Sequence, residues 1–385
     1  MRRAGTALLV LVFVLAGCGP PASAPRTERE RVLLGFIANL SAANSEVALA
    51  VERGIQIALA EYNSKSDSIY EVRLRKADTK GTPEGTGQAA ANLVKTERLI
   101  GVLGPLSETE SRLAGGVFED AEIPYLSPNI SATTIPSQGA RSFRRLVAND
   151  RSEGQLLARL AAKRAGGALA VFHDGGPEGS LIATVTKETL DQDKRPAQRF
   201  ESVGPKGDLK SLIDALMSDP PKGVVYAGSP GRGAQLIGGL RKAGYQGAAV
   251  VSHHMREPKQ FAPEMAGTFT ASPLADPTHK DLANFAAIYQ GRFDSPLPAL
   301  SVEAYEGATM LLEAIQEVEP KPKTLSQFFR LNRSFLGESK VYTYDENGEL
   351  IGPPFWVYEM KGTSWRLTGR SDQLRLELKE TKPVS

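Results

Sequence analysis

The sequence predicts an α/β protein made of two doubly wound lobes, and two observations support this fold class. Short apolar runs, typical of strands buried on both faces of a parallel sheet, alternate with segments in which apolar residues recur at helical spacing. This alternation is interrupted and begins again at about Phe143. Because a chain of 385 residues is long enough for about two domains, the two βα series indicate two lobes.

The first series opens with a nearly continuous apolar run at residues 32–38, which predicts a buried strand. Apolar residues at helical spacing predict a helix over 47–62, and alternating residues predict a strand over 70–77. The sequence Thr-Pro-Glu at 82–84 is typical of a helix start, with a capping residue, a proline in the first turn and an acid near the positive end of the helix dipole.

The next unit is the part of the chain in which we expect a ligand site. It consists of a strand at 100–103, a helix at 109–121 and a strand that begins near residue 123. Both strands end in turns rich in Gly, Pro and Ser. Ligands of open α/β sheets bind at the carboxyl ends of the strands, where a helix N-terminus also offers free N–H groups to an anion.

The second series repeats the pattern and then gives way to longer helices. Alternating helices and strands are expected at 152–165, 168–172, 181–190, 199–203, 209–217, 223–226, 234–243 and 248–251. Amphipathic helices are expected at 281–289 and 302–318. The turn Asp345-Glu346-Asn347-Gly348 predicts a hairpin between strands at 341–344 and 355–359, followed by a charged tail at 371–385.

Composition excludes several classes of function. With 46 basic and 44 acidic residues, the net charge of +2 gives no reason to expect a nucleic-acid partner. We expect no cofactor, because the glycines at 228–233 are in the wrong order for a dinucleotide loop and no Gly-Lys-Ser/Thr follows them. We expect no metal, because His253 and His254 lack further ligands at a suitable spacing. No Gly-x-Ser-x-Gly elbow is present, so no enzyme is expected.

Residues 1–17 are predicted to be an export signal. Arg2 and Arg3 precede an apolar run at 7–15 that is too short to span a bilayer. The small residues before Cys18, the only cysteine, resemble the lipobox of bacterial lipoproteins, which implies cleavage there and a lipid on Cys18; the alternative is an ordinary signal peptide with a chance cysteine. Residues 18–30, rich in Pro, Ala and Ser, then form a flexible tether from the membrane to an extracytoplasmic body.

Several short motifs follow one another between about residues 31 and 358. They are Asn39-Leu40-Ser41, Glu61-Tyr62-Asn63, Gly104-Pro105-Leu106-Ser107, Pro124-Tyr125-Leu126-Ser127-Pro128, Val171-Phe172-His173-Asp174, Val225-Tyr226-Ala227-Gly228 and Tyr305-Glu306-Gly307-Ala308. In this order and spacing, the motifs resemble those of type I periplasmic ligand-binding proteins, in the branch related to receptors for leucine, isoleucine and valine in ABC importers.

The resemblance implies two lobes that close on a ligand, joined by a hinge in which the chain crosses three times. Lobe one would comprise 31–145 plus 272–325, and lobe two 146–271 plus 326–370. Arg144 and Arg145, near the first crossing, are expected to be salt-bridge partners in the hinge. Closure would report occupancy to a partner, because the ligand favours one arrangement of the lobes.

The resemblance also places candidate ligand-binding residues on both lobes. They are Val47, Ser107, Glu108, Thr109, Asn129, Ile130 and Ser131 in lobe one, and Pro177, Ser229 and His254 in lobe two. Val47, Pro177 and the Ser229 loop stand where relatives often have aromatic residues, which indicates a different ligand or none.

Glu108 occupies the position at which amino-acid receptors usually place a serine that binds the ligand carboxylate. Two carboxylates about 4 Å apart repel by about 4 kcal/mol at an effective dielectric near 20, so an ordinary α-amino acid would not be bound in the usual way. Glu108 either stabilises the helix start, worth about 0.3 to 1 kcal/mol, or binds a cationic or polyhydroxylated ligand.

The resemblance implies a lipid-anchored solute-binding receptor of a branched-chain-amino-acid-type ABC importer, located in the cell envelope on the periplasmic or extracellular face. Its partners would be a small polar ligand of the amino acid or amide class and an ABC permease. The alternative is a sensor or an envelope-partner lipoprotein on the same scaffold, for example an activator of peptidoglycan synthesis. The altered pocket favours this alternative, whereas the complete scaffold favours the receptor.

Overall fold

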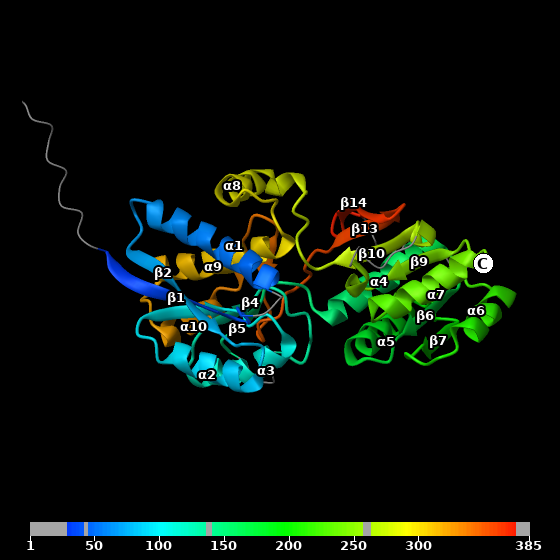
Figure 1. Cartoon of the computed structure of the whole chain (residues 1–385), viewed down its shortest axis with the longest axis horizontal. Coiled ribbons are helices and arrows are strands. Elements are labelled where there is room, and N and C mark those ends of the chain that lie inside the picture. Colours follow the sequence, from blue (N-terminus) through cyan, green and yellow to red (C-terminus); the bar gives the residue numbers. More distant parts are fainter. Residues whose placement is uncertain (1–28, 42–44, 136–140, 257–262, 375–385) are drawn as a thin grey trace, which may run out of the picture.

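The computed structural model describes residues 29–41, 45–135, 141–256 and 263–374, which form two lobes arranged along the long axis of the molecule (Figure 1). The expected signal peptide, Cys18 and all but the last two residues of the expected tether lie outside the described residues. The same holds for 375–385 of the expected tail. None of the described helices is long and apolar enough to cross a bilayer.

Lobe one contains a five-stranded parallel sheet in the order β2-β1-β3-β4-β5. The strands are β1 (Glu30–Ala38), β2 (Tyr70–Asp78), β3 (Leu99–Leu103), β4 (Tyr125–Ser127) and β5 (Phe143–Arg145). β3 lies at the centre and is buried at every position, as its continuous apolar run predicts. The carboxyl ends of these strands therefore meet at one edge of the sheet.

Five helices cover the two faces of this sheet. They are α1 (Ser45–Ser64), α2 (Pro83–Val94), α3 (Glu108–Asp120), α9 (Ala299–Glu317) and α10 (Pro322–Leu331). Alternate side chains of β1 point to opposite faces, so Phe36 packs with α1 and α9 whereas Ile37 packs with α2 and α3. Gly54 lets α1 approach α9 closely, because a Cβ there would lie 2.3 Å from the carbonyl oxygen of Ser301.

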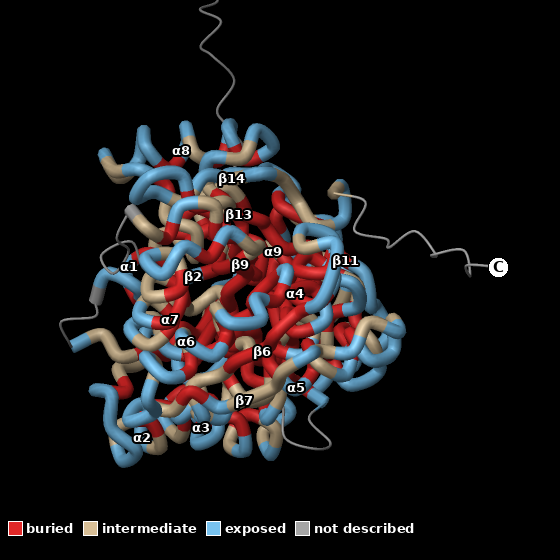
Figure 2. The backbone as a smooth tube through the Cα atoms, turned by 90° about the vertical axis from the view of Figure 1, so that its right-hand side faces the viewer, coloured by how far each residue is buried: buried red, intermediate tan, exposed pale blue. Residues whose placement is uncertain are grey.

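Lobe two contains a seven-stranded mixed sheet in the order β14-β13-β10-β9-β8-β6-β7. The strands are β6 (Leu169–His173), β7 (Arg199–Ser202), β8 (Gly223–Ala227), β9 (Ala248–Val251), β10 (Thr268–Ser272), β13 (Trp356–Lys361) and β14 (Ser364–Arg370). The helices are α4 (Asp150–Ala165), α5 (Pro177–Gln192), α6 (Leu209–Ser218) and α7 (Pro230–Lys242). A further helix, α8 (Ala283–Phe293), lies beside α1 and α9 of lobe one, where Phe285 contacts Tyr305 (Figure 1). Buried residues gather inside the molecule and exposed residues lie at its rim (Figure 2).

The expected hairpin between 341–344 and 355–359 is wrong. β12 (Val341–Thr343) pairs with β11 (Ser334–Leu336) in a separate two-stranded sheet, and β13 pairs with β10 and β14 in lobe two. The turn at 345–348 closes only a single bridge, between Tyr344 and Leu350. The residues at 345–348 therefore predict a turn but not the strands that pair. The hydrophobic core that buries each strand decides which strand it pairs with.

The second part of lobe one extends further than expected. Phe329, Phe335 and Tyr342 pack in one core cluster with β1, α1 and α9 of lobe one, although residues from 326 onward were expected in lobe two. The buried carboxylate of Glu306 on α9 accepts hydrogen bonds from Ser339 and Tyr342 and so anchors this segment. Lobe two resumes at Phe355, which lies in the core cluster of α4 and α5. The chain passes between the two sheets three times: after β5, after β10 and before β13.

Candidate ligand cleft between the lobes

The loop after β3 forms the lobe-one wall of the candidate cleft. Ser107 caps α3, because its hydroxyl accepts a hydrogen bond from the N–H of Glu110 at 3.3 Å. The helix begins at Glu108, one residue earlier than the pattern predicted. The capped first turn therefore fixes Ser107, Glu108 and Thr109 at the carboxyl end of the central strand.

Glu108 is charge-compensated in the structure. It forms an ion pair with Arg112, one helical turn further on, and accepts a hydrogen bond of 2.8 Å from the hydroxyl of Thr134. Arg112 also donates to Thr134 at 2.8 Å. Because a paired carboxylate repels an anion less than a free one, the expected exclusion of a ligand carboxylate is weakened. The half-exposed Arg112 adds a positive group to the same wall.

The residues of the loop after β4 mainly contact neighbouring parts of lobe one. Asn129 donates to the carbonyl oxygen of Leu106 at 2.7 Å, and Ile130 is buried. Ser131 accepts a backbone hydrogen bond from Asp150 at 3.0 Å. These three candidate residues therefore connect the loop to its neighbours, and none of them lines the cavities described below.

Arg145 holds the same loop in place through hydrogen bonds to its backbone. Its fully buried guanidinium donates to the carbonyl oxygens of Ile130, Ala132 and Ile135, and pairs with Glu349 at 2.9 Å. The expected hinge ion pair is thus present for Arg145. Arg144 instead donates to two backbone carbonyl oxygens, those of Phe143 and Phe329.

The lobe-two wall is built from the starts of α5 and α7. Pro177 is the first residue of α5, and Ser229 precedes α7. Asp174, at the end of β6, accepts hydrogen bonds from the N–H of Gly176 at 2.9 Å and from the N–H of Ser229 at 2.7 Å. Asp174 therefore holds the two loops together at the cleft.

Two histidine–carboxylate pairs complete this wall. Nδ1 of His253 lies 2.6 Å from Glu153, Nε2 of His254 lies 3.1 Å from Glu178, and the two rings are 3.9 Å apart. The hydrogen bond from His254 lowers the pKa of Glu178. Burial alone would lower the pKa of His253, but the carboxylates of Glu153, Asp150 and Glu178 together outweigh burial and raise it. No group of His, Cys, Asp and Glu side chains within the described ranges is arranged to hold a metal ion.

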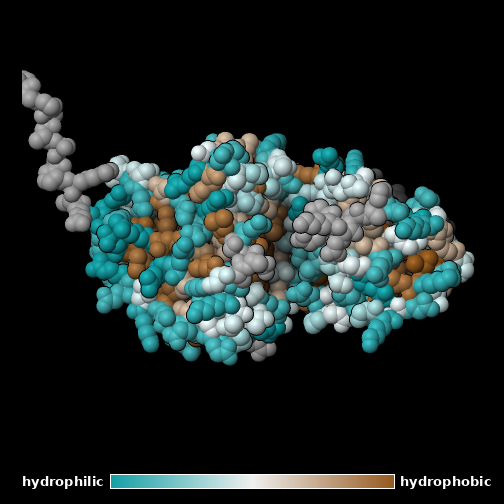
Figure 3. All heavy atoms as spheres, viewed as in Figure 1, coloured by the Kyte–Doolittle hydropathy of each residue, from teal (hydrophilic) through white to brown (hydrophobic). Residues whose placement is uncertain are grey.

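Groups from both walls line one cavity of about 340 Å³. Glu108 and Arg112 come from lobe one, and Asp174, Pro177, Glu178, Ser229 and His254 are among those from lobe two. The cavity therefore brings together four of the candidate residues (Glu108, Pro177, Ser229 and His254) and presents charges of both signs. The two lobes are visible as separate bodies with much hydrophilic surface (Figure 3).

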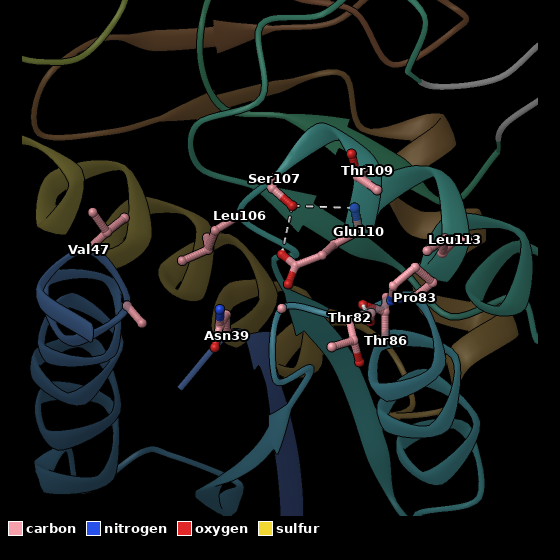
Figure 4. Close-up of a pocket in the computed structure, with 12 residues that line it drawn as sticks. Asn39, Val47, Thr82, Pro83, Thr86, Leu106, Ser107, Thr109, Glu110 and Leu113 are labelled. Atoms are coloured by element: carbon pink, nitrogen blue, oxygen red, sulfur yellow. Dashed lines mark hydrogen bonds between the residues drawn. The ribbon is translucent and has the colours of Figure 1, made fainter. Parts of the chain in front are cut away.

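A second cavity, of about 520 Å³, lies in lobe one where α1, α2 and α3 begin, and we call it the lobe-one cavity (Figure 4). Its lining includes three candidate residues: Val47, Ser107 and Thr109. It also includes Glu110, which the sequence did not single out.

Sequence reasoning missed Arg112, Asp174 and Glu110 as residues of these cavities. The spacing of four residues between Glu108 and Arg112 is a helical pairing signal that could have identified Arg112. Asp174 belonged to a motif that carried the resemblance but was not assigned a role. Thr134 lies 26 residues from Glu108, and nothing in the local sequence connects the two.

The two lobes and the cavity between them define a binding protein of the two-lobed type. The sequence profile of the periplasmic binding protein family matches residues 32–341, so the chain belongs to this family. It is 24% identical over 283 residues to the leucine-, isoleucine-, valine-, threonine- and alanine-binding protein of Pseudomonas aeruginosa, covering 70% of this chain and 74% of that relative.

Solved structures confirm the expected fold. A leucine-binding protein, LivK, of Thermotoga maritima has a TM-score of 0.69 at 20% identity and covers 88% of this chain and 98% of its own. An ABC transporter substrate-binding protein of Desulfitobacterium hafniense, in complex with leucine, has a TM-score of 0.74 at 19% identity, with 88% and 100% covered. These relatives are substrate-binding proteins, and the chain is accordingly a binding protein and not an enzyme.

Proposed function

We propose that this protein is the extracytoplasmic solute receptor of a branched-chain-amino-acid-type ABC importer and closes its lobes on a small polar ligand of the amino acid or amide class. The observation that carries the proposal is the cavity between the lobes, where Arg112 faces acidic groups of lobe two. The names of the relatives support the class of ligand.

The charges of this cavity suit a zwitterion. Arg112, half exposed on lobe one, is the group that attracts a ligand carboxylate, and it offers several N–H donors. Asp174 and Glu178 on lobe two attract an ammonium group. A ligand that contacts both walls binds the closed form better than the open form, so its binding shifts the population towards closure.

The lipid anchor and the permease belong to the same proposal. The resemblance of residues before Cys18 to a lipobox supports the anchor, and membership of the periplasmic binding protein family supports an extracytoplasmic site of action. The permease is the partner that relatives of the transporter class imply.

Calorimetric titration of the purified protein with leucine, isoleucine, alanine, threonine and their amides tests the proposal. We expect at least one of them to bind, and Arg112→Met to weaken binding of the carboxylate-bearing ligand by about 10- to 100-fold, because a hydrogen bond to a charged group contributes about 1.5 to 3 kcal/mol. The matched control is Arg73→Met, which removes a similarly exposed ion-paired arginine on β2.

Two outcomes would contradict the proposal. One is the absence of binding by any amino acid or amide, which would favour a lipoprotein that binds an envelope partner. The other is an Arg112→Met variant that binds its ligand as tightly as the unmodified protein.

A further inference from the structure

Glu110 is the single charged residue among those that line the lobe-one cavity. Its side chain is 7% exposed, and it accepts hydrogen bonds from the hydroxyls of Thr79 and Ser107, the latter at 2.9 Å. Within the described parts of the chain, no lysine or arginine forms an ion pair with it. The cavity therefore carries one negative charge without a cationic partner, which is unfavourable for a buried carboxylate.

The cap of α3 accounts for only part of the hydrogen bonding of this carboxylate. In a capping box, the acid three residues after the cap accepts a hydrogen bond from the cap's backbone N–H. Here the Glu110 carboxylate accepts instead from the Thr79 hydroxyl, beyond the end of β2. It also accepts from the hydroxyl of Ser107 (Figure 4). Two hydroxyl donors leave about half of the acceptor capacity of a carboxylate for a further donor.

Apolar side chains surround the approach to Glu110. Val47 on α1 and Leu113 on α3 line the cavity and remain 47% and 42% exposed, and Leu106 lies between the two helices (Figure 4). Large aliphatic side chains left this exposed around one buried carboxylate are suited to methylene groups that end in a cation.

We infer that the lobe-one cavity takes a ligand side chain that ends in an ammonium or guanidinium group, with Glu110 as its counter-ion. Val47, Leu106 and Leu113 contact the methylene groups of that side chain. This inference rests on the proposed function and specifies its ligand as a cationic amino acid or a related amine. The first turn of α3 contributes to both cavities, since Glu108 lines one and Thr109 and Glu110 line the other.

Isosteric ligand pairs that differ in charge test this inference by calorimetry. Ornithine and norleucine form one pair, and arginine and citrulline form the other. We expect the unmodified protein to bind the cationic member of at least one pair about 10-fold or more tightly, and Glu110→Gln to reduce this ratio to about one. Glu84→Gln is the matched control, because it removes an exposed acid from the first turn of α2 that does not line the cavity.

A second variant guards against a folding defect in Glu110→Gln. Val47 is exposed at the rim, so Val47→Lys leaves the core unchanged and places a competing cation beside the same cavity. It should weaken binding of the cationic ligand several-fold more than binding of its neutral isostere.

Equal affinity for both members of each pair, or a ratio that Glu110→Gln leaves unchanged, would overturn the inference. If the neutral ligands still bind in that case, the proposed receptor function is not contradicted. If none of these ligands binds while leucine or alanine does, the inference fails alone. If no amino acid or amide binds, the proposed function fails and the inference fails with it.

Discussion

The two walls of the cleft are built from different chemistry. The lobe-one wall consists of a capped helix start and a loop that the buried guanidinium of Arg145 fastens through three carbonyl oxygens and Glu349. The lobe-two wall contains His253 and His254 with their carboxylate partners. Arginine stays protonated at any physiological pH, whereas histidine titrates near neutrality. The first wall therefore keeps the charge of its arginine in the neutral pH range, whereas the second wall contains His253, whose pKa is raised.

This difference separates two steps of ligand binding. The groups that recognise a ligand on lobe one are positioned by hydrogen bonds that do not depend on pH in the neutral range. On lobe two, His254 and Glu178 line the cavity, and the ring of His254 lies 3.9 Å from that of His253, a histidine with a raised pKa. We therefore expect capture by lobe one and closure of lobe two to respond differently to mutation and to pH.

Removal of Arg145 should produce the largest loss of stability. In Arg145→Met, three carbonyl oxygens lose a donor and Glu349 loses its cationic partner, and breaking a buried ion pair costs about 3 to 5 kcal/mol. Urea unfolding measures the change. The control is Arg144→Met, since Arg144 is equally buried but donates to two carbonyl oxygens and has no ion pair. A loss in Arg145→Met no larger than in the control would contradict the role assigned to Arg145.

The lobe-two wall should make stability depend on pH. Although burial opposes it, the Glu153 carboxylate raises the pKa of His253. A histidine with a raised folded-state pKa contributes stability that is fully present below its unfolded pKa of about 6.5 and is lost as the pH rises through the folded value. We therefore expect the free energy of unfolding to fall as the pH rises above about 6.5.

Glu153→Gln tests the cause of this dependence. The amide can still accept from the N–H of His253 but no longer favours the protonated ring, so the slope of stability against pH above neutrality should flatten. Glu188→Gln, which removes an exposed acid from α5, should keep the slope of the unmodified protein. Urea unfolding at a series of pH values distinguishes the two. An unchanged slope in Glu153→Gln would show that other groups, such as Asp150, dominate the titration.

The sequence could predict elements that depend on local patterns, but not contacts between residues that are far apart in the chain. Strands such as β1 and β3 and helices such as α1 were predictable because apolar periodicity is a local signal. The pairing of β12 with β11 was not, since it depends on the core into which Tyr342 packs and on the buried Glu306. Turn chemistry at 345–348 predicted a turn but not its partners.

In the cleft, local sequence patterns predicted the contacts of the lobe-one wall better than those of the lobe-two wall. The start of α3 was predictable to within one residue, and the partner of Glu108 lies one helical turn away. Glu153 and His253 are 100 residues apart, so only the fold brings them together. The charge state of the second wall is therefore a tertiary property that no sequence pattern encodes.

The smallest expected effect concerns the cap of α3. Ser107→Ala removes the acceptor for the N–H of Glu110 and one of the two donors to its carboxylate, and loss of a serine cap costs about 1 kcal/mol. Asp208→Ala, which removes the cap of α6 in lobe two, should lower stability by a similar amount. Only Ser107→Ala should also change ligand selection, because the loss of a donor leaves Glu110 more dependent on a cationic ligand. Thermal unfolding and titration with the ornithine and norleucine pair measure both effects, and equal selectivity in the two variants would mean that Ser107 acts on the helix alone.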